Sequence, residues 1–83
     1  MSFDSTFYAR TMGSTAPIRE LSRVTLGVPQ TAEDGRILPA GSTGTIVGTW
    51  ARGAAYEVEF TSPFAALVTV EPADFHVTAE PEF

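Results

Sequence analysis

The 83-residue sequence contains no cysteine, no lysine and a single histidine, His76. Without cysteine, the chain has no disulfide framework, no thiolate zinc site and no thiol nucleophile. A lone histidine lacks the companions that a zinc site or a nucleophilic triad requires. Phosphate loops of the ATPase type need a lysine before a helix, and this chain offers neither. We therefore expect a protein that is not an enzyme and that has no catalytic residue, no metal and no cofactor.

Positive charge is scarce. The chain has five arginines and ten acidic residues, which gives a net charge of −5 and a pI near 4.5. Binding to nucleic acid or to an anionic membrane surface depends on clustered cations, so we expect neither partner. Long apolar runs are also missing, and the sequence therefore predicts no secretory leader and no membrane span. By elimination, we expect a cytoplasmic location.

The length allows one small domain, and a hydrophobic fraction of 43% indicates a folded chain. Residues 1–17 are rich in serine, threonine and glycine and lack periodicity, so we interpret them as a flexible N-terminal arm. Residues 18–78 carry the strand patterns and form the expected domain, and residues 79–83 form a C-terminal tail.

Short stretches of alternating or β-branched residues predict five strands, at residues 18–28, 43–50, 55–60, 65–70 and 76–78. The first strand carries an irregularity near Ser22 and Arg23. Residues 29–44 form a long loop in which Ile37 and Leu38 are expected to fold back on the core. Residues 72–75 suit one 3₁₀ turn. The predicted core is Val24, Leu26, Ile46, Val58, Phe60, Val68 and Val70.

Five short strands, a long first loop, a tight hairpin and a 3₁₀ turn before the last strand are typical of an SH3-like barrel. The predicted fold class is therefore all-β, a small five-stranded SH3-like barrel. Closure of the sheet would leave so short a chain without an exposed edge. Gly44 stands where the long loop meets a β-branched strand, so we expect a positive φ or a bulge there.

Three segments carry a resemblance to a known family: LPAGSTGTIV at residues 38–47, YEVEF at residues 56–60 and LVTV at residues 67–70. Together they resemble the "G-x-x-G-T-V-V … Y-E-V-E-F … V-T-V" pattern of the small bacterial domain of unknown function 4926. They are similar, more distantly, to the SH3-like barrel of nitrile hydratase β-subunits. The resemblance spans residues 18–78 and implies a barrel without assigned chemistry. The metal of nitrile hydratase sits on cysteines of the other subunit, so no catalytic residue carries over.

Trp50, Arg52 and Tyr56 flank one predicted hairpin. Tryptophan, tyrosine and arginine are enriched among binding hot spots, and a cation–π contact from Arg52 to either ring is feasible. These residues are therefore candidates for a partner-binding patch. The alternative for Tyr56 is packing, because it shares a strand face with Val58 and Phe60.

Glu57 and Glu59 complete the candidate patch. They point to one face of the predicted strand, about 7 Å apart by the strand repeat. That spacing resembles the carboxylate pair of a glycoside hydrolase, but the sequence indicates no cleft around it. We interpret the two residues as a solvated acidic face at the rim of the patch.

These features favour a small, acidic, non-enzymatic protein-binding module, of the kind that acts as an antitoxin or immunity-type inhibitor of a neighbouring protein. A basic partner is expected, since acidic charge fits a basic active site and speeds association. The alternatives are an accessory or maturation subunit of a nitrile-hydratase-like metalloenzyme, and a nucleic-acid-binding barrel that uses aromatic stacking. The sequence leaves the oligomeric state open.

Overall fold

The computed structural model describes residues 18–81, so the predicted arm (residues 1–17) and the last two residues of the predicted tail lie outside the described residues. The described part is all-β, with seven strands and one 3₁₀ turn. The elements are β1 (Arg23–Leu26), β2 (Gln30–Thr31), β3 (Ile37–Leu38), β4 (Thr43–Trp50), β5 (Ala55–Phe60), β6 (Ala66–Val70), η1 (Pro72–Asp74) and β7 (Phe75–Ala79).

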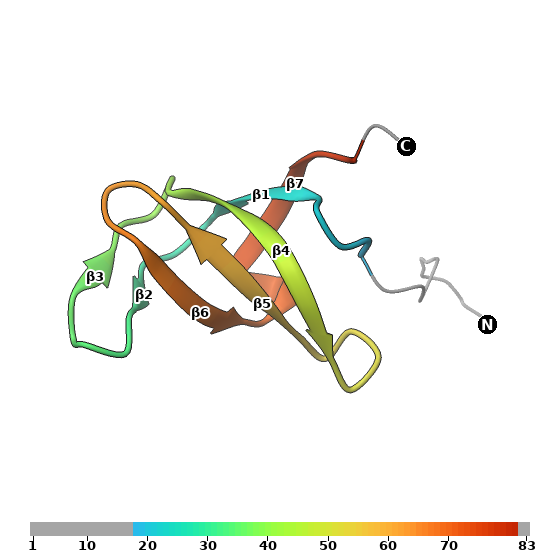
Figure 1. Ribbon diagram of the computed structural model, residues 1–83, viewed down its shortest axis with the longest axis horizontal. Helices are drawn as coiled ribbons and strands as arrows, with labels where there is room; N and C mark the ends of the chain where they lie inside the picture. The colour runs from blue at the N-terminus through green and yellow to red at the C-terminus, as the bar shows by residue number, and fades with distance from the viewer. Residues whose placement is uncertain (1–17, 82–83) are drawn as a thin grey trace.

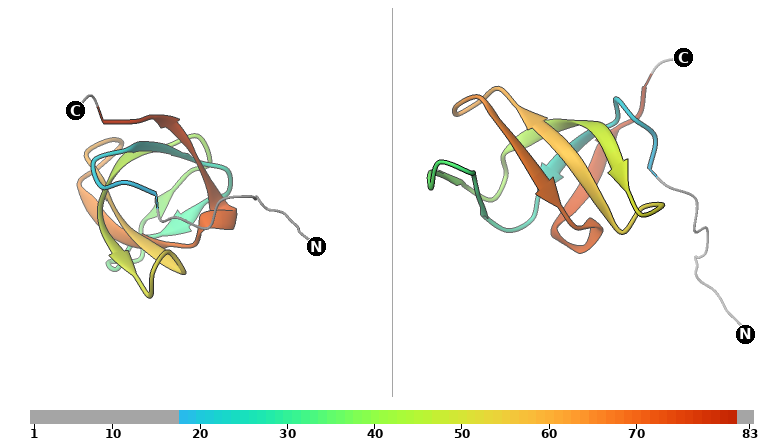
Figure 2. Two further views of the ribbon diagram at one scale, coloured as in Figure 1. Left: turned by 90° about the vertical axis from the view of Figure 1, so that its right-hand side faces the viewer. Right: turned by 60° about the horizontal axis from the view of Figure 1, so that its bottom comes forward.

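Five of the strands form one antiparallel sheet in the order β6-β5-β4-β1-β7, and β2 pairs with β3 in a separate ladder (Figure 1). The sheet coils around a single interior, as the end-on view in Figure 2 shows. Order, connections and the 3₁₀ turn before the last strand are those of a small SH3-like barrel. The fold class predicted from the sequence is therefore confirmed.

The core follows from the alternation of the strands. All seven predicted core residues are buried, and in β5 the inward positions alternate with Glu57 and Glu59 on the outside. A half-buried strand alternates between buried and exposed residues because successive side chains point to opposite faces of the sheet. Four further residues complete the core: Ala32, Leu38, Tyr56 and Phe75.

The first strand is shorter than predicted. Leu21 has a φ of 71° and is 50% exposed, so regular strand geometry begins only at Arg23. Leu21 and Ser22 still bond to the sheet, since the Leu21 N–H donates to the Ile46 carbonyl and the Ile46 N–H donates to the Ser22 carbonyl. The expected irregularity is thus a break before β1 that leaves the pairing with β4 in place, together with a register shift between Arg23 and Val24 in the pairing with β7.

The long first loop contains the unpredicted β2–β3 ladder. Leu38 is completely buried, as expected, but Ile37 is 61% exposed because adjacent residues of a strand face opposite sides. The Arg36 guanidinium lies 3.9 Å from the centre of the Phe64 ring. This cation–π contact ties the loop to the connection between β5 and β6.

Gly44 has neither a positive φ nor a register shift of its own, so the reason expected for its glycine is wrong. It is buried in β4, where a Cβ would lie 2.6 Å from Cγ1 of Val58 and 2.9 Å from the carbonyl oxygen of Glu59. Close approach of β5, and not unusual backbone geometry, requires glycine here.

The sheet also leaves edges. Within residues 18–81, β6 and β7 stand at opposite ends of the sheet order and no ladder joins them. The expectation that closure removes every edge is therefore wrong. The outer edge of β6 faces the segment around β2, with which it makes only a slight contact.

Candidate functional site: the outer surface of β4, β5 and β6

A β-bulge decides where Trp50 points. Ile46 lies opposite Val58, but the next pair joins Gly48 to Glu57, so Val47 is an extra residue in β4. Directly opposite residues share a sheet face, and the bulge therefore moves the following even-numbered positions from the inner to the outer face. Trp50 ends up outside with 55% of its surface exposed.

The indole of Trp50 is held in place by Glu57. Its Nε1–H donates a hydrogen bond of 2.7 Å to Oε2 of Glu57, and the Thr69 hydroxyl donates to the same oxygen at 3.0 Å. The three residues come from β4, β5 and β6. One carboxylate thus fixes an exposed aromatic ring across three strands.

The hairpin tip beside Trp50 is strained. Ala51 and Arg52 have φ values of 48° and 60°, and Gly53 follows at 106°. The Gly53 and Ala54 N–H groups both donate to the Trp50 carbonyl, which holds the tip in this conformation. Left-handed backbone costs a non-glycine residue about 1–2 kcal/mol, and such residues gather at functional sites.

Arg52 makes no ion pair and no cation–π contact with another residue in the part of the chain that the structure describes. The cation–π contact that the sequence makes feasible between Arg52 and the ring of Trp50 or Tyr56 is therefore not formed among the described residues. Arg52 is exposed at the hairpin tip, two residues after Trp50.

Tyr56 lies in the core and not in the surface patch. It is 2% exposed, packs edge-on against Phe75 with ring centres 5.7 Å apart, and its hydroxyl accepts a hydrogen bond of 2.9 Å from the Ile18 N–H. Of the two interpretations left open by the sequence, packing is the one that this geometry supports. Its partner-binding role is accordingly not retained.

Glu59 is exposed on the same face as Glu57 and lies opposite Leu67 in the register of β5 and β6. Leu67 and Val47 are 58% and 39% exposed, and sequence reasoning missed both. Leu67 carries a readable signal, because it is out of phase with the inward Val68 and Val70. We call the outer surface the set Val47, Trp50, Glu57, Glu59, Leu67 and Thr69.

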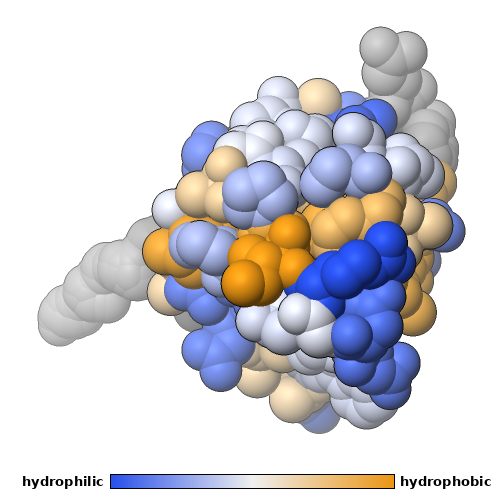
Figure 3. All heavy atoms as spheres, turned by 90° about the vertical axis from the view of Figure 1, so that its left-hand side faces the viewer, coloured by the Kyte–Doolittle hydropathy of each residue, from blue (hydrophilic) through white to orange (hydrophobic). Residues whose placement is uncertain are grey.

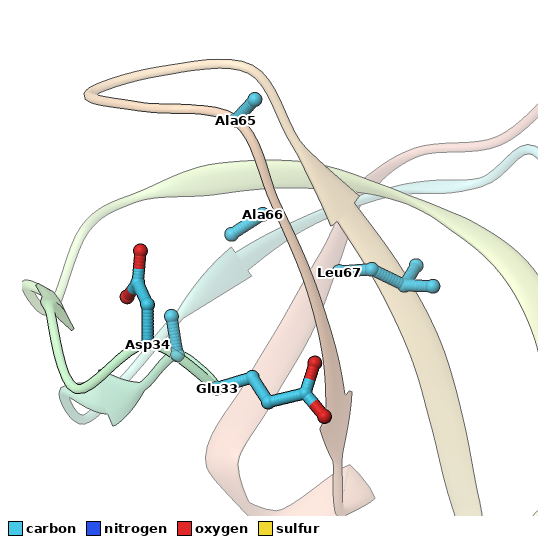
Figure 4. Close-up of a pocket in the computed structure, with 6 residues that line it drawn as sticks. Glu33, Asp34, Ala65, Ala66 and Leu67 are labelled. Atoms are coloured by element: carbon cyan, nitrogen blue, oxygen red, sulfur yellow. The ribbon is translucent and has the colours of Figure 1, made fainter.

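A depression of about 350 Å³ separates the edge of β6 from the loop that follows β2. Its walls are residues 65–67 on one side and residues 32–34 on the other, and Glu33 reaches from the loop toward β6 (Figure 4). A second depression of about 440 Å³ continues along β6, lined by Thr31, Glu33, Glu57, Leu67, Val68 and Thr69. We call the two together the β6 groove.

The loop wall of the groove is acidic. Asp34 accepts hydrogen bonds from the backbone N–H and then the Nε–H of Arg36, at 3.0 and 2.7 Å, and these bonds lower the pKa of its carboxyl below the ordinary 3.8. Figure 3 looks onto the side with β2 and β3 and shows apolar surface directly beside strongly hydrophilic surface. The lining of the groove combines the apolar Leu67 and Val68 with the carboxylates of Glu33 and Glu57.

Glu57 lines one depression of the described surface and Glu59 lines another. Among residues 18–81, no cluster of three or more histidine, aspartate or glutamate side chains is placed to bind a metal ion. The same residues include no helix long and apolar enough to cross a membrane.

Comparison of the chain with protein-family models, curated proteins and solved structures finds no match. The resemblance to the domain of unknown function 4926 and to nitrile hydratase β-subunits therefore stays a prediction from the motifs at residues 38–70.

Proposed function

We propose that this chain is a non-enzymatic, acidic protein-binding module of the cytoplasm, of the antitoxin or immunity type, which binds a basic protein through its outer surface. The observation that carries the proposal is the Trp50 side chain, which is 55% exposed and yet fixed by its 2.7 Å hydrogen bond to Glu57. An exposed aromatic ring that is already ordered loses little conformational entropy on binding, which favours affinity.

Residues around Trp50 fit the anatomy of an interface. Leu67 and Val47 add exposed apolar surface, and Arg52 stands unpaired by described residues at the hairpin tip. Interfaces are enriched in aromatic residues and arginine at their centres, with polar residues at the rim. Trp50 and Arg52 accordingly form the centre, with Glu59 at the rim.

Charge favours a basic partner. The chain carries −5 overall, and both Glu57 and Glu59 lie on the outer surface. Opposite charge on the partner would speed association, and salt would weaken it by screening. Single-stranded nucleic acid requires a cationic groove beside stacking rings, and the outer surface offers acids instead.

The experiment compares four immobilised proteins: the native chain, Trp50→Ala, Arg52→Ala, and Leu21→Ala as the control. Leu21 is a similarly exposed apolar residue, 50% against 55%, whose backbone bonds to Ile46 on the side of β4 away from β5. Proteins retained from the native host are identified, and the retained partner is then purified for binding kinetics.

We expect a basic protein that binds the native chain and Leu21→Ala with equal affinity. Its binding to Trp50→Ala should be weaker by about 2 kcal/mol or more, and it should dissociate faster from Arg52→Ala than from the native chain. Affinity should fall as salt rises. Tight retention of single-stranded oligonucleotides at low salt, lost in Trp50→Ala, would instead show a nucleic-acid-binding barrel. A partner that binds Trp50→Ala as tightly as the native chain would refute the proposed surface.

A further inference from the structure

Within residues 18–81, the outer edge of β6 has no strand partner, and β2 makes only a slight contact with it. One side of β6 pairs with β5 from Ala66 to Val70. Within the described residues, no backbone hydrogen bond joins the other side to the β2–β3 ladder or to any loop. A row of backbone donors and acceptors without backbone partners is a template for another extended chain.

The β6 groove runs along this edge and separates it from the loop that follows β2. The two depressions follow β6 from residue 65 to residue 69, with residues 31–34 as the opposite wall. Glu33 lines both depressions and reaches toward β6 (Figure 4). The groove therefore offers strand edge on one side and a carboxylate on the other.

The charges around the groove select its occupant. Glu33 and Glu57 line the same depression, and no arginine lines either part of the groove. Arg36, in the same loop as Glu33, is engaged by Asp34 and Phe64. A second copy of this chain would bring the same acids to the groove, and like charges placed opposite each other destabilise a strand pair. An extended segment with basic side chains is complementary instead.

We propose that β6 accepts an extended basic segment of the partner as an added sixth strand of the sheet. Alternate residues of a strand share a face, so the segment's register follows from β6. An apolar side chain would lie beside Leu67, and a lysine or arginine two positions away would lie beside Thr69, between Glu33 and Glu57. This inference rests on the proposed function, because it states how the basic partner binds.

The probe is a capped synthetic heptapeptide, Thr-Val-Thr-Lys-Thr-Val-Thr, which presents valine and lysine on one face of a strand. Added to the full chain, it should slow hydrogen exchange at alternate amides of β6 by tenfold or more. Alternate amides are expected because those between them already bond to β5. Replacing the peptide's lysine by glutamate should weaken binding at least fivefold.

Backbone chemistry gives the sharpest readout. Residue i and residue i+2 of a strand direct their N–H groups to the same edge. One peptide is therefore N-methylated at its odd-numbered positions and a second peptide at its even-numbered positions, so that each has the opposite edge blocked. One should lose at least tenfold in affinity and the other little. On the protein, Glu33→Gln should weaken binding several-fold, while Glu20→Gln, an exposed acid outside both depressions, should not.

Four outcomes would overturn strand addition: no protection of β6 amides, equal loss from both methylated peptides, tighter binding of the glutamate peptide, or concentration-dependent β6 protection in a dimer without peptide. These readouts do not involve Trp50. If the peptide results agree with strand addition while Trp50→Ala still binds the partner, the proposed outer surface is refuted and strand addition is supported. If the peptide results contradict strand addition while Trp50→Ala no longer binds the partner, strand addition is refuted and the proposed outer surface is supported.

Discussion

Replacing Gly44 by alanine should destabilise the barrel although it adds one methyl group. The new Cβ would lie 2.6 Å from Cγ1 of Val58, 2.9 Å from Cε2 of Phe60 and 2.9 Å from the carbonyl oxygen of Glu59. All three contacts are closer than real Cβ atoms tolerate. The third neighbour is backbone, so it can recede only if β4 and β5 move apart.

The size of the effect is a difference of two terms. Overpacking a core costs about 1–3 kcal/mol, and the rigid neighbours of Gly44 put this site at the upper end. Replacing glycine by alanine restricts the unfolded chain and returns about 0.4–1 kcal/mol. The net loss is about 2 kcal/mol, which for a domain of this size lowers the Tm by roughly 8–16 °C. Gly44→Val adds two further methyl groups and should cost more.

Gly48→Ala is the matched control, since it makes the same change in the same strand. A Cβ at Gly48 would lie 3.5 Å from Cβ and Cγ of Glu57, which is ordinary contact, and its φ is not positive. Only the unfolded-state term applies, so stability should be unchanged or slightly higher. Urea unfolding followed by circular dichroism measures both variants. Equal stability of Gly44→Ala and Gly48→Ala would refute the close-approach argument.

A second variant tests the mechanism. Val58→Ala removes the methyl group nearest to the new Cβ but leaves the Glu59 carbonyl in place. Combined with Gly44→Ala, it should cost less than the sum of the two single changes, because one steric conflict disappears. Strict additivity would mean that the Val58 contact does not contribute to the cost.

Three further predictions concern the arm, the acidic loop and the hairpin tip. Removal of residues 1–15 keeps Ile18, which packs on the core, so β-type circular dichroism and cooperative melting should persist; loss of cooperativity would place the arm in the core. Because the pKa of the Asp34 carboxyl is lowered in the folded chain, its hydrogen bonds stabilise the fold above pH 3.8, and this stabilisation is lost as pH falls through the lower folded-state pKa. In Arg36→Gln, an NMR titration of the Asp34 carboxyl should still give a lowered pKa, because the backbone N–H of residue 36 is the larger cause. Arg52→Asn should gain up to about 1 kcal/mol, since asparagine tolerates positive φ, yet bind the partner more weakly; lower stability in chemical denaturation would contradict the strain argument.

The fold was largely predictable because alternation and turn residues carry it. Residues 55–60 alternate strictly, and the structure buries the expected half. What the pattern does not encode is backbone detail. Leu21 adopts a positive φ, although leucine rarely does. No local sequence pattern predicts the short β2–β3 ladder, which forms within the long first loop.

The candidate site was only partly predictable, because it depends on contacts across strands. Glu57 and Glu59 lie on the outer face as expected, whereas Tyr56 is core. The outward position of Trp50 depends on the bulge at Val47, which the sequence pattern did not predict. Thr69 enters through the register of β5 and β6, which places it opposite Glu57. Sequence distance hides such neighbours, since pairing partners are set by the whole sheet.

The bulge at Val47 explains why one strand serves both the core and the surface. Without the extra residue, the alternation that buries Gly44 and Ile46 would continue inward to Trp50. With it, Gly48 faces outward opposite Glu57. Trp50 then follows on the same face and donates to Glu57. One inserted residue thus turns a core-forming strand into the support of the outer surface.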